Sequence, residues 1–114
     1  MNHDKNITAT VGHLIDGQIV HDNGRSQPVF NPATGQASLS VELASQATVE
    51  AAIASAEKAF PAWRNTLPLK RARVMNQFKV LLEQNADKIA ALITAEHGKV
   101  LADAHGELQR GIEN

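Results

Sequence analysis

The stretch ATVEAAIASAEKAFPAWRNT, residues 47–66, marks the point where the pattern of this chain changes from strands to helices. Its apolar residues recur at steps of four, three, four and three positions, which is the spacing of one face of an amphipathic helix. Thr48 is a suitable N-cap for that helix, and Pro61 is expected to bend or end it. The apolar face consists of Val49, Ile53, Ala56, Phe60 and Trp63.

The residues before this stretch have the pattern of short antiparallel strands. Asp16 and Gly17 lie between two apolar runs and predict a hairpin near residues 13–20, because a type I′ turn needs positive φ at both central positions. A brief strand is expected near residues 28–31, followed by a turn rich in Asn, Pro and Gly.

A further strand is expected near residues 38–44, where apolar and polar residues alternate. Such alternation is typical of a strand with one face on the core and one face in water. The predicted inner face carries Leu39, Val41 and Leu43, and the outer face carries Ser38, Ser40 and Glu42.

Helical periodicity continues to the last residue. Pro68 is expected to open a second helix that runs to about Asn85, and Asn85 is expected to cap a third helix that ends at Gly98. The second helix would turn Ala72, Met75, Phe78 and Leu82 inward and the basic residues Lys70, Arg71 and Arg73 outward. A fourth helix would turn Leu101, Ala104, Leu108 and Ile112 inward.

This order of about four helices after the strands suggests an α+β domain when the chain is taken alone. As the front of a longer protein, the same elements could flank a sheet that later sequence builds. The fourth helix has no Gly C-cap and no following Pro behind its apolar stripe, so we expect a truncated chain.

Composition excludes several classes of function. The chain has 114 residues and a net charge of −1, so neither a nucleic-acid footprint nor a basic membrane-binding surface is indicated. It has no cysteine, which removes disulfides, thiolate metal sites and a thiol nucleophile. No apolar run is long enough for a signal peptide or a membrane span, and we expect a cytoplasmic protein.

The five histidines do not have the spacing of a metal site. His13 and His21 flank the predicted hairpin but would point to opposite faces, while Gly98 interrupts the helix between His97 and His105. No glycine-rich phosphate loop and no Ser/His/Asp arrangement is present either. The residues therefore predict no metal site, no cofactor site and no catalytic residue in this chain.

The polar face of the last helix is the one candidate binding feature. Asp103, Glu107, Arg110 and Asn114 recur at helical spacing opposite the apolar stripe. Glu107 and Arg110 have the spacing of a solvated ion pair. Alternatively, Arg110 could bind an anion, because Gly106 one turn earlier leaves room for a close approach.

Several stretches resemble the N-terminal segment of the aldehyde dehydrogenase superfamily. They are LIDGQIV (14–20), NPATGQ (31–36), the stretch 47–66 and the run from Lys70 to Asn114. The ending GELQRGIEN (106–114) is similar to the CoA-acylating methylmalonate-semialdehyde dehydrogenase branch. The resemblance implies an α/β fold in which residues 13–114 form the first part of an NAD-binding domain, behind a polar tail of residues 1–12.

The resemblance also implies a function. Enzymes of that branch oxidise methylmalonate or malonate semialdehyde with NAD, transfer the acyl group to CoA and release carbon dioxide, in valine and inositol catabolism. The motif arginine, here Arg110, is implicated in binding the acidic substrate or CoA. The cysteine nucleophile, the general base and the sites for NAD and CoA lie in sequence that this chain does not contain, and the parent is expected to be a tetramer.

Two hypotheses follow from the resemblance. The chain is the N-terminal part of a working dehydrogenase, in which it supplies scaffold and Arg110, and is inactive by itself. Alternatively, it is a natural truncated protein that docks to other dehydrogenase subunits. Either way, we expect the apolar faces of the isolated chain to make it prone to aggregate or partly molten.

Overall fold

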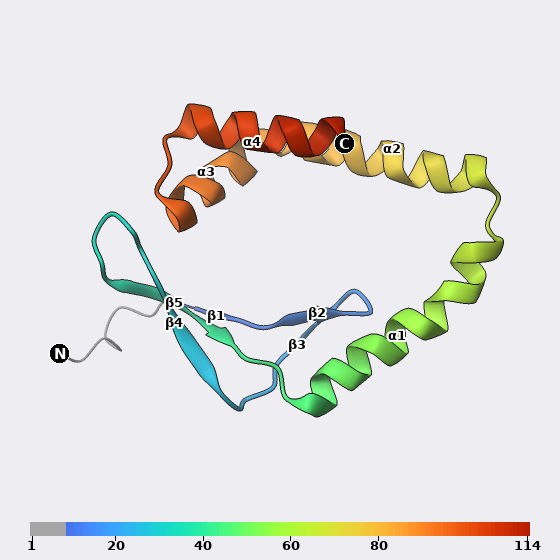
Figure 1. Cartoon of the computed structure of the whole chain (residues 1–114), viewed down its shortest axis with the longest axis horizontal. Helices are drawn as coiled ribbons and strands as arrows, with labels where there is room; N and C mark the ends of the chain where they lie inside the picture. Colours follow the sequence, from blue (N-terminus) through green and yellow to red (C-terminus); the bar gives the residue numbers. More distant parts are fainter. Residues whose placement is uncertain (1–8) are drawn as a thin grey trace. The chain divides into compact units, whose positions relative to one another are not determined.

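The computed structural model describes residues 9–114, which form five short strands followed by four helices (Figure 1). The chain divides into two compact units, one made of residues up to 30 and 35–65, the other of residues 31–34 and 66–114. The strands are β1 (Thr10–Val11), β2 (His13–Ile15), β3 (Gln18–Val20), β4 (Ser26–Phe30) and β5 (Ala37–Glu42). The helices are α1 (Gln46–Asn65), α2 (Pro68–Gln84), α3 (Ala86–His97) and α4 (Leu101–Glu113).

The hairpin of the first unit forms as the sequence predicts. Strands β2 and β3 are antiparallel, with His13 opposite Val20. Asp16 and Gly17 have φ angles of 51° and 73°, so both central residues of the turn lie in the left-handed region that a type I′ turn requires. The Asp-Gly pair therefore determines the register of these two strands.

The second sheet of the first unit has β5 at its centre, between β1 and β4. Strands β4 and β5 are antiparallel and pair Ser26 with Glu42, in agreement with the predicted strands. Strand β1 was not predicted, and its parallel pairing with β5 corrects the expectation of an all-antiparallel arrangement. Two residues, Thr10 and Val11, are too few to produce an alternating pattern, and parallel pairing joins segments distant in the sequence.

The burial of β5 is the reverse of the predicted pattern. Ser40 and Glu42 are each only 9 % exposed, whereas Leu39 and Val41 are half-buried. The two polar residues are tolerated because they are hydrogen-bonded: the Ser40 hydroxyl donates to the Gln27 carbonyl, and Glu42 accepts two bonds described below.

Helix α1 begins earlier than predicted. It starts at Gln46, and the cap is Ser45, whose Oγ accepts a bond from the Thr48 amide at 3.2 Å. Thr48 is not the cap because it lies inside the helix, and its hydroxyl donates to the Asp22 carboxylate at 2.9 Å. The helix also continues through Pro61 to Asn65. The ring deprives the Glu57 carbonyl of its partner, but Glu57 is exposed and water can replace the lost bond.

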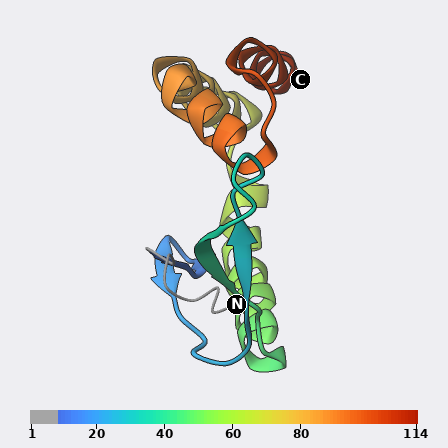
Figure 2. The same cartoon turned by 90° about the vertical axis from the view of Figure 1, so that its left-hand side faces the viewer.

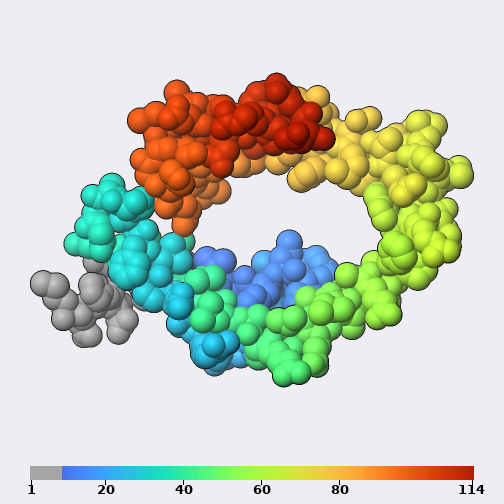
Figure 3. All heavy atoms as spheres, viewed as in Figure 1, coloured from blue at the N-terminus to red at the C-terminus, as the bar shows by residue number. Residues whose placement is uncertain are grey.

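The second unit contains α2, α3 and α4, and all three helices lie within two residues of their predicted bounds. Pro68 occupies the first turn of α2, where its missing N–H costs nothing. Asn85 separates α2 from α3, but its side chain donates back to the Leu81 carbonyl instead of capping α3. Helix α4 lies beside α3 and contacts α2 (Figures 2 and 3).

Small residues fill the buried part of this unit. Ala90 of α3 and Ala104 of α4 have no exposed surface, and α3 and α4 form the most extensive helix–helix contact of the unit. Met75 and Phe78 of α2 are 55 % and 53 % exposed and Leu82 is half-buried, so the predicted inner face of α2 is only partly covered within residues 9–114. The amphipathic pattern of α2 therefore indicates which face is apolar, but it does not indicate which residues cover that face.

Gly98 ends α3 in the predicted position. Its φ is 85°, its amide donates to the Thr94 carbonyl at 2.8 Å, and a side chain there would meet the Pro32 ring at 3.0 Å. Any other residue at position 98 would therefore have a strained backbone, and its Cβ would also be too close to the Pro32 ring.

We predict that Gly98→Ala destabilises the second unit by about 1–2 kcal/mol, the range for forcing an L-residue into the left-handed region. The measurement is the urea concentration that removes half of the helical circular dichroism signal. Gly24→Ala is the matched control, because a Cβ at Gly24 meets nothing within 4 Å. Equal midpoints for the two variants would show that the turn does not need glycine.

Candidate anion site on helix α4

The local sequence determines which side chains α4 turns outward. The helix starts after Val100 and carries Asp103 in its first turn, where an acidic group is favoured by the helix dipole. Ala104 is buried, and Leu108 and Ile112 are half-buried. The opposite face therefore exposes Glu107 and Arg110, as predicted.

Glu107 pairs with a residue outside the helix. Its Oε2 accepts a hydrogen bond from the ammonium of Lys99, which lies directly after the Gly98 turn. This bond and the charge of Lys99 lower the pKa of the Glu107 carboxyl, while the charges of His97 and Arg110 contribute least. The expected pairing of Glu107 with Arg110 is therefore wrong, because Lys99 is a closer partner.

The guanidinium of Arg110 consequently has no acidic partner among residues 9–114. It folds back along the helix, with Nη1 3.9 Å from where a Cβ of Gly106 would stand. Side chains in a helix lean toward the preceding turn, which explains this direction. Arg110 is exposed, so its planar set of donors is available to an anion.

Arg110 also has a structural role that needs no ligand. It stands in the last turn of α4, where a cation interacts favourably with the helix dipole. Its carbonyl accepts a bond from the Asn114 side chain at 2.8 Å. This structural role is compatible with anion binding. The structural role uses the backbone carbonyl and the positive charge of Arg110, whereas an anion would be bound by the N–H donors of the guanidinium.

The histidines that the structure describes do not assemble a metal site. Among residues 9–114, no three His, Cys, Asp or Glu side chains are placed to hold an ion. His21 pairs with Glu42 at 3.0 Å, and His105 lies 3.4 Å from Asp87. Within the same residues, none of the helices is long and apolar enough to cross a membrane.

A cluster of polar residues joins the strands of the first unit to α1. Glu42 accepts bonds from His21 Nδ1 and from the Asp22 amide, the latter at 2.7 Å. The carboxylate of Asp22 in turn accepts bonds from the Ser45 amide and the Thr48 hydroxyl. We call these five residues the α1 clasp, because they fix the first turn of α1 to the loop after β3.

The clasp stabilises the charged forms of its two carboxyls. The Ser45 amide bond, followed by the Thr48 hydroxyl bond, lowers the pKa of Asp22. The bond from the Asp22 amide is the largest cause that lowers the pKa of Glu42, with smaller contributions from His21 and His13. These shifts accompany a structural link between the loop after β3, strand β5 and the first turn of α1.

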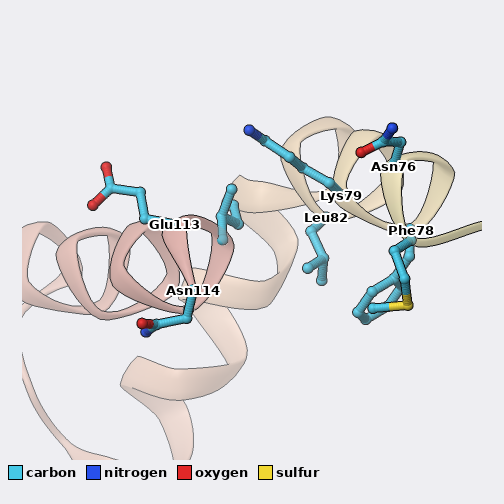
Figure 4. Close-up of a pocket in the computed structure, with 9 residues that line it drawn as sticks. Asn76, Phe78, Lys79, Leu82, Glu113 and Asn114 are labelled. Atoms are coloured by element: carbon cyan, nitrogen blue, oxygen red, sulfur yellow. The ribbon is translucent and has the colours of Figure 1, made fainter. Parts of the chain in front are cut away.

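Each unit contains a hollow lined by apolar side chains. In the second unit, a pocket of about 340 Å³ lies between α2 and the end of α4, with Phe78 and Leu82 on one side and Glu113 and Asn114 on the other (Figure 4). Lys79 at its rim is 4.0 Å from Glu83. In the first unit, a groove of about 350 Å³ lies between strand β2 and α1.

The glycines with positive φ do not build a phosphate cradle. Gly17 is in the hairpin, Gly35 is in the loop between β4 and β5, and Gly98 caps α3. A dinucleotide site needs a glycine-rich turn from a strand directly into a helix, and none of these positions provides one.

The fold and the motifs are those of aldehyde dehydrogenases. The model of the aldehyde dehydrogenase family matches residues 19–114, and the chain belongs to that family. A malonate-semialdehyde dehydrogenase of Pseudomonas aeruginosa is 60 % identical over 105 residues, which are 92 % of this chain and 21 % of the relative. An acylating, mitochondrial methylmalonate-semialdehyde dehydrogenase of Arabidopsis thaliana is 43 % identical over 104 residues, which are 90 % of this chain and 17 % of the relative.

Solved structures agree with this assignment. The methylmalonate-semialdehyde dehydrogenase of Oceanimonas doudoroffii has a TM-score of 0.91 and 65 % identity, covering 92 % of this chain and 22 % of that one. A Sinorhizobium meliloti protein described as a methylmalonate-semialdehyde dehydrogenase, solved with NAD, has a TM-score of 0.89 and 45 % identity, covering 91 % and 21 %. The chain thus spans about a fifth of the length of the relatives it matches.

Two features of the site were missed in the sequence. Lys99 is eight positions before Glu107, and only the left-handed turn at Gly98 brings the two together. Asp22 is 23 positions before Ser45, and no local pattern links them. A glycine before a basic residue and a following helix is the one signal that could have indicated the first pair.

The clasp predicts a pH dependence. Because the folded pKa of Asp22 is below its unfolded value, its contribution is present above about pH 4 and is lost as the pH falls through the folded pKa. We expect Asp22→Asn to lower the urea midpoint of the helical signal at pH 7 and to have a smaller effect at pH 2. Glu57→Gln, an exposed change on the same helix, is the control. An Asp22→Asn effect as large at pH 2 as at pH 7 would contradict the clasp.

Proposed function

We propose that this chain forms the N-terminal part of the NAD-binding domain of an NAD-dependent, CoA-acylating semialdehyde dehydrogenase. The support is its membership of the aldehyde dehydrogenase family and its high identity to malonate- and methylmalonate-semialdehyde dehydrogenases. A relative that is 45 % identical was solved with NAD, which supports NAD as the cofactor of the whole enzyme. The proposed boundary places the domain at residues 13–114, behind a tail of residues 1–12.

The proposed reaction oxidises malonate or methylmalonate semialdehyde to an acyl-CoA with loss of carbon dioxide. A thiolate would form the thiohemiacetal and then the thioester, and this chain has no cysteine. The chemistry therefore belongs to residues that the relatives carry in their remaining four-fifths. This chain contributes scaffold and one binding residue, in an enzyme that we propose to be a cytoplasmic homotetramer.

That residue is Arg110. The observation that supports it is the diversion of Glu107 to Lys99, which leaves the Arg110 guanidinium unpaired within residues 9–114. Gly106 leaves the side of the guanidinium free of a side chain. A semialdehyde with a carboxylate presents two oxygens that match the planar donor fork of arginine. CoA phosphate is the second anion with the same chemistry.

The test uses a chimera in which this chain replaces the matching segment of the Pseudomonas aeruginosa relative. We predict that Arg110→Ala raises the KM for malonate semialdehyde about 10- to 100-fold, since a charge-assisted hydrogen bond contributes about 1.5–3 kcal/mol. The KM for propanal, which has no carboxylate, should not change. NADH formation at saturating NAD and CoA is the readout, and Arg110→Lys should give an intermediate value.

Arg73→Ala is the matched control, because Arg73 is exposed on α2 and has no acidic partner among the described residues. A raised KM for CoA alone would assign Arg110 to CoA. An equal loss of kcat for both aldehydes, or no change at all, would contradict a role in anion binding. The 114-residue chain alone, assayed in parallel, should form no NADH.

A further inference from the structure

Helix α1 carries an apolar face that residues 9–114 leave largely uncovered. Val49, Ile53, Phe60 and Trp63 are 48, 62, 57 and 41 % exposed, and no residue of the helix is buried. We call these four residues the α1 stripe. Their alternating steps of three and four positions, through Ala56, are the pattern that packs against another apolar surface.

The stripe continues into the groove beside strand β2. Val49 and Ile53 line that groove together with Leu14 and Ile15, and its volume is about 350 Å³. His13 also lines it, and the Nε2 atom of His13 is buried without a hydrogen-bond partner. A buried polar atom without a partner is costly, so a polar group of a docked segment would satisfy it.

The comparisons indicate what covers this surface. The backbone of this chain matches a solved dehydrogenase with a TM-score of 0.91, and that match uses only 22 % of the solved chain. The same conformation therefore exists inside a protein more than four times as long. A backbone that is already in that conformation presents the α1 stripe in the geometry that the remaining residues require.

We propose that the α1 stripe and the adjoining groove bind the remaining four-fifths of an aldehyde dehydrogenase chain when it is supplied as a separate polypeptide. The partner is the apolar helix or sheet surface of that remainder, and a polar group on it bonds His13 Nε2. This inference rests on the proposed function, because both assume that the chain is part of a dehydrogenase fold. Its test does not depend on Arg110 or on activity.

The test co-expresses the tagged 114-residue chain with the Pseudomonas aeruginosa relative shortened by its matching segment, and with the intact relative as comparison. We expect a one-to-one complex with the shortened relative, measured by native mass spectrometry after tag purification. The intact relative should not bind, because its own segment occupies the site. A shortened relative that is soluble only with the chain also supports the proposal, and one that is insoluble in both cases counts against it.

Variants of α1 locate the contact. Ile53→Glu with Phe60→Glu should reduce the yield of complex at least tenfold. Ala51→Glu with Ala54→Glu places the same charges on the other side of the helix and should leave the yield unchanged. Circular dichroism checks that both double variants keep the helix. Arg110→Ala should bind like the native chain, so failure of docking and failure of the proposed anion role are distinguishable.

Three outcomes would overturn the proposal. Equal binding to the intact relative would assign the stripe to docking between dehydrogenase subunits. A dimer of the chain that excludes the shortened relative would assign it to self-association. Equal loss of complex in both double variants would show that the stripe is not the contact.

Discussion

The left-handed turn at Gly98 is the constraint on which the candidate site depends. It ends α3, reverses the chain so that α4 packs back on α3, and brings the ammonium of Lys99 to the Glu107 carboxylate. Lys99 then pairs with the Glu107 carboxylate. Without Lys99, this carboxylate would pair with Arg110, which lies one helical turn further along α4. A single backbone conformation thus decides that the exposed face of α4 presents an unpaired guanidinium and not a closed ion pair.

A second constraint is the small amount of apolar surface that this chain buries by itself. Among residues 9–114, the buried hydrophobic residues are three alanines, Ala37, Ala90 and Ala104. Alanine burial supplies little hydrophobic free energy, since the contribution scales with the apolar area removed from water. The large apolar side chains of α1 and α2 remain exposed, and the relatives that share this backbone are about five times as long. The segment therefore has the backbone conformation of the matching part of a solved dehydrogenase, while its large apolar side chains are exposed among residues 9–114.

Local signals predicted the elements that local physics determines. Asp16-Gly17 specified the hairpin and its register, and Gly98 specified the end of α3, because both positions need positive φ. What the sequence did not reveal depends on pairs distant in the chain. The parallel strand β1, the bonds from Ser45 and Thr48 to Asp22, and the Lys99 partner of Glu107 all belong to this group. The inversion of burial along β5 has the same origin, since Glu42 is buried only because the loop after β3 supplies its partners.

The most direct test of the central claim is the pKa of the Glu107 carboxyl, measured by carbon-detected NMR titration of the native chain and of Lys99→Met and Arg110→Met. Lys99 is the main cause that lowers this pKa, and Arg110 is the smallest. The account predicts that Lys99→Met raises the pKa toward its ordinary value, while Arg110→Met leaves it close to that of the native chain. A rise in Arg110→Met as large as in Lys99→Met would mean that Glu107 already neutralises Arg110, and the guanidinium would then not be free to bind an anion.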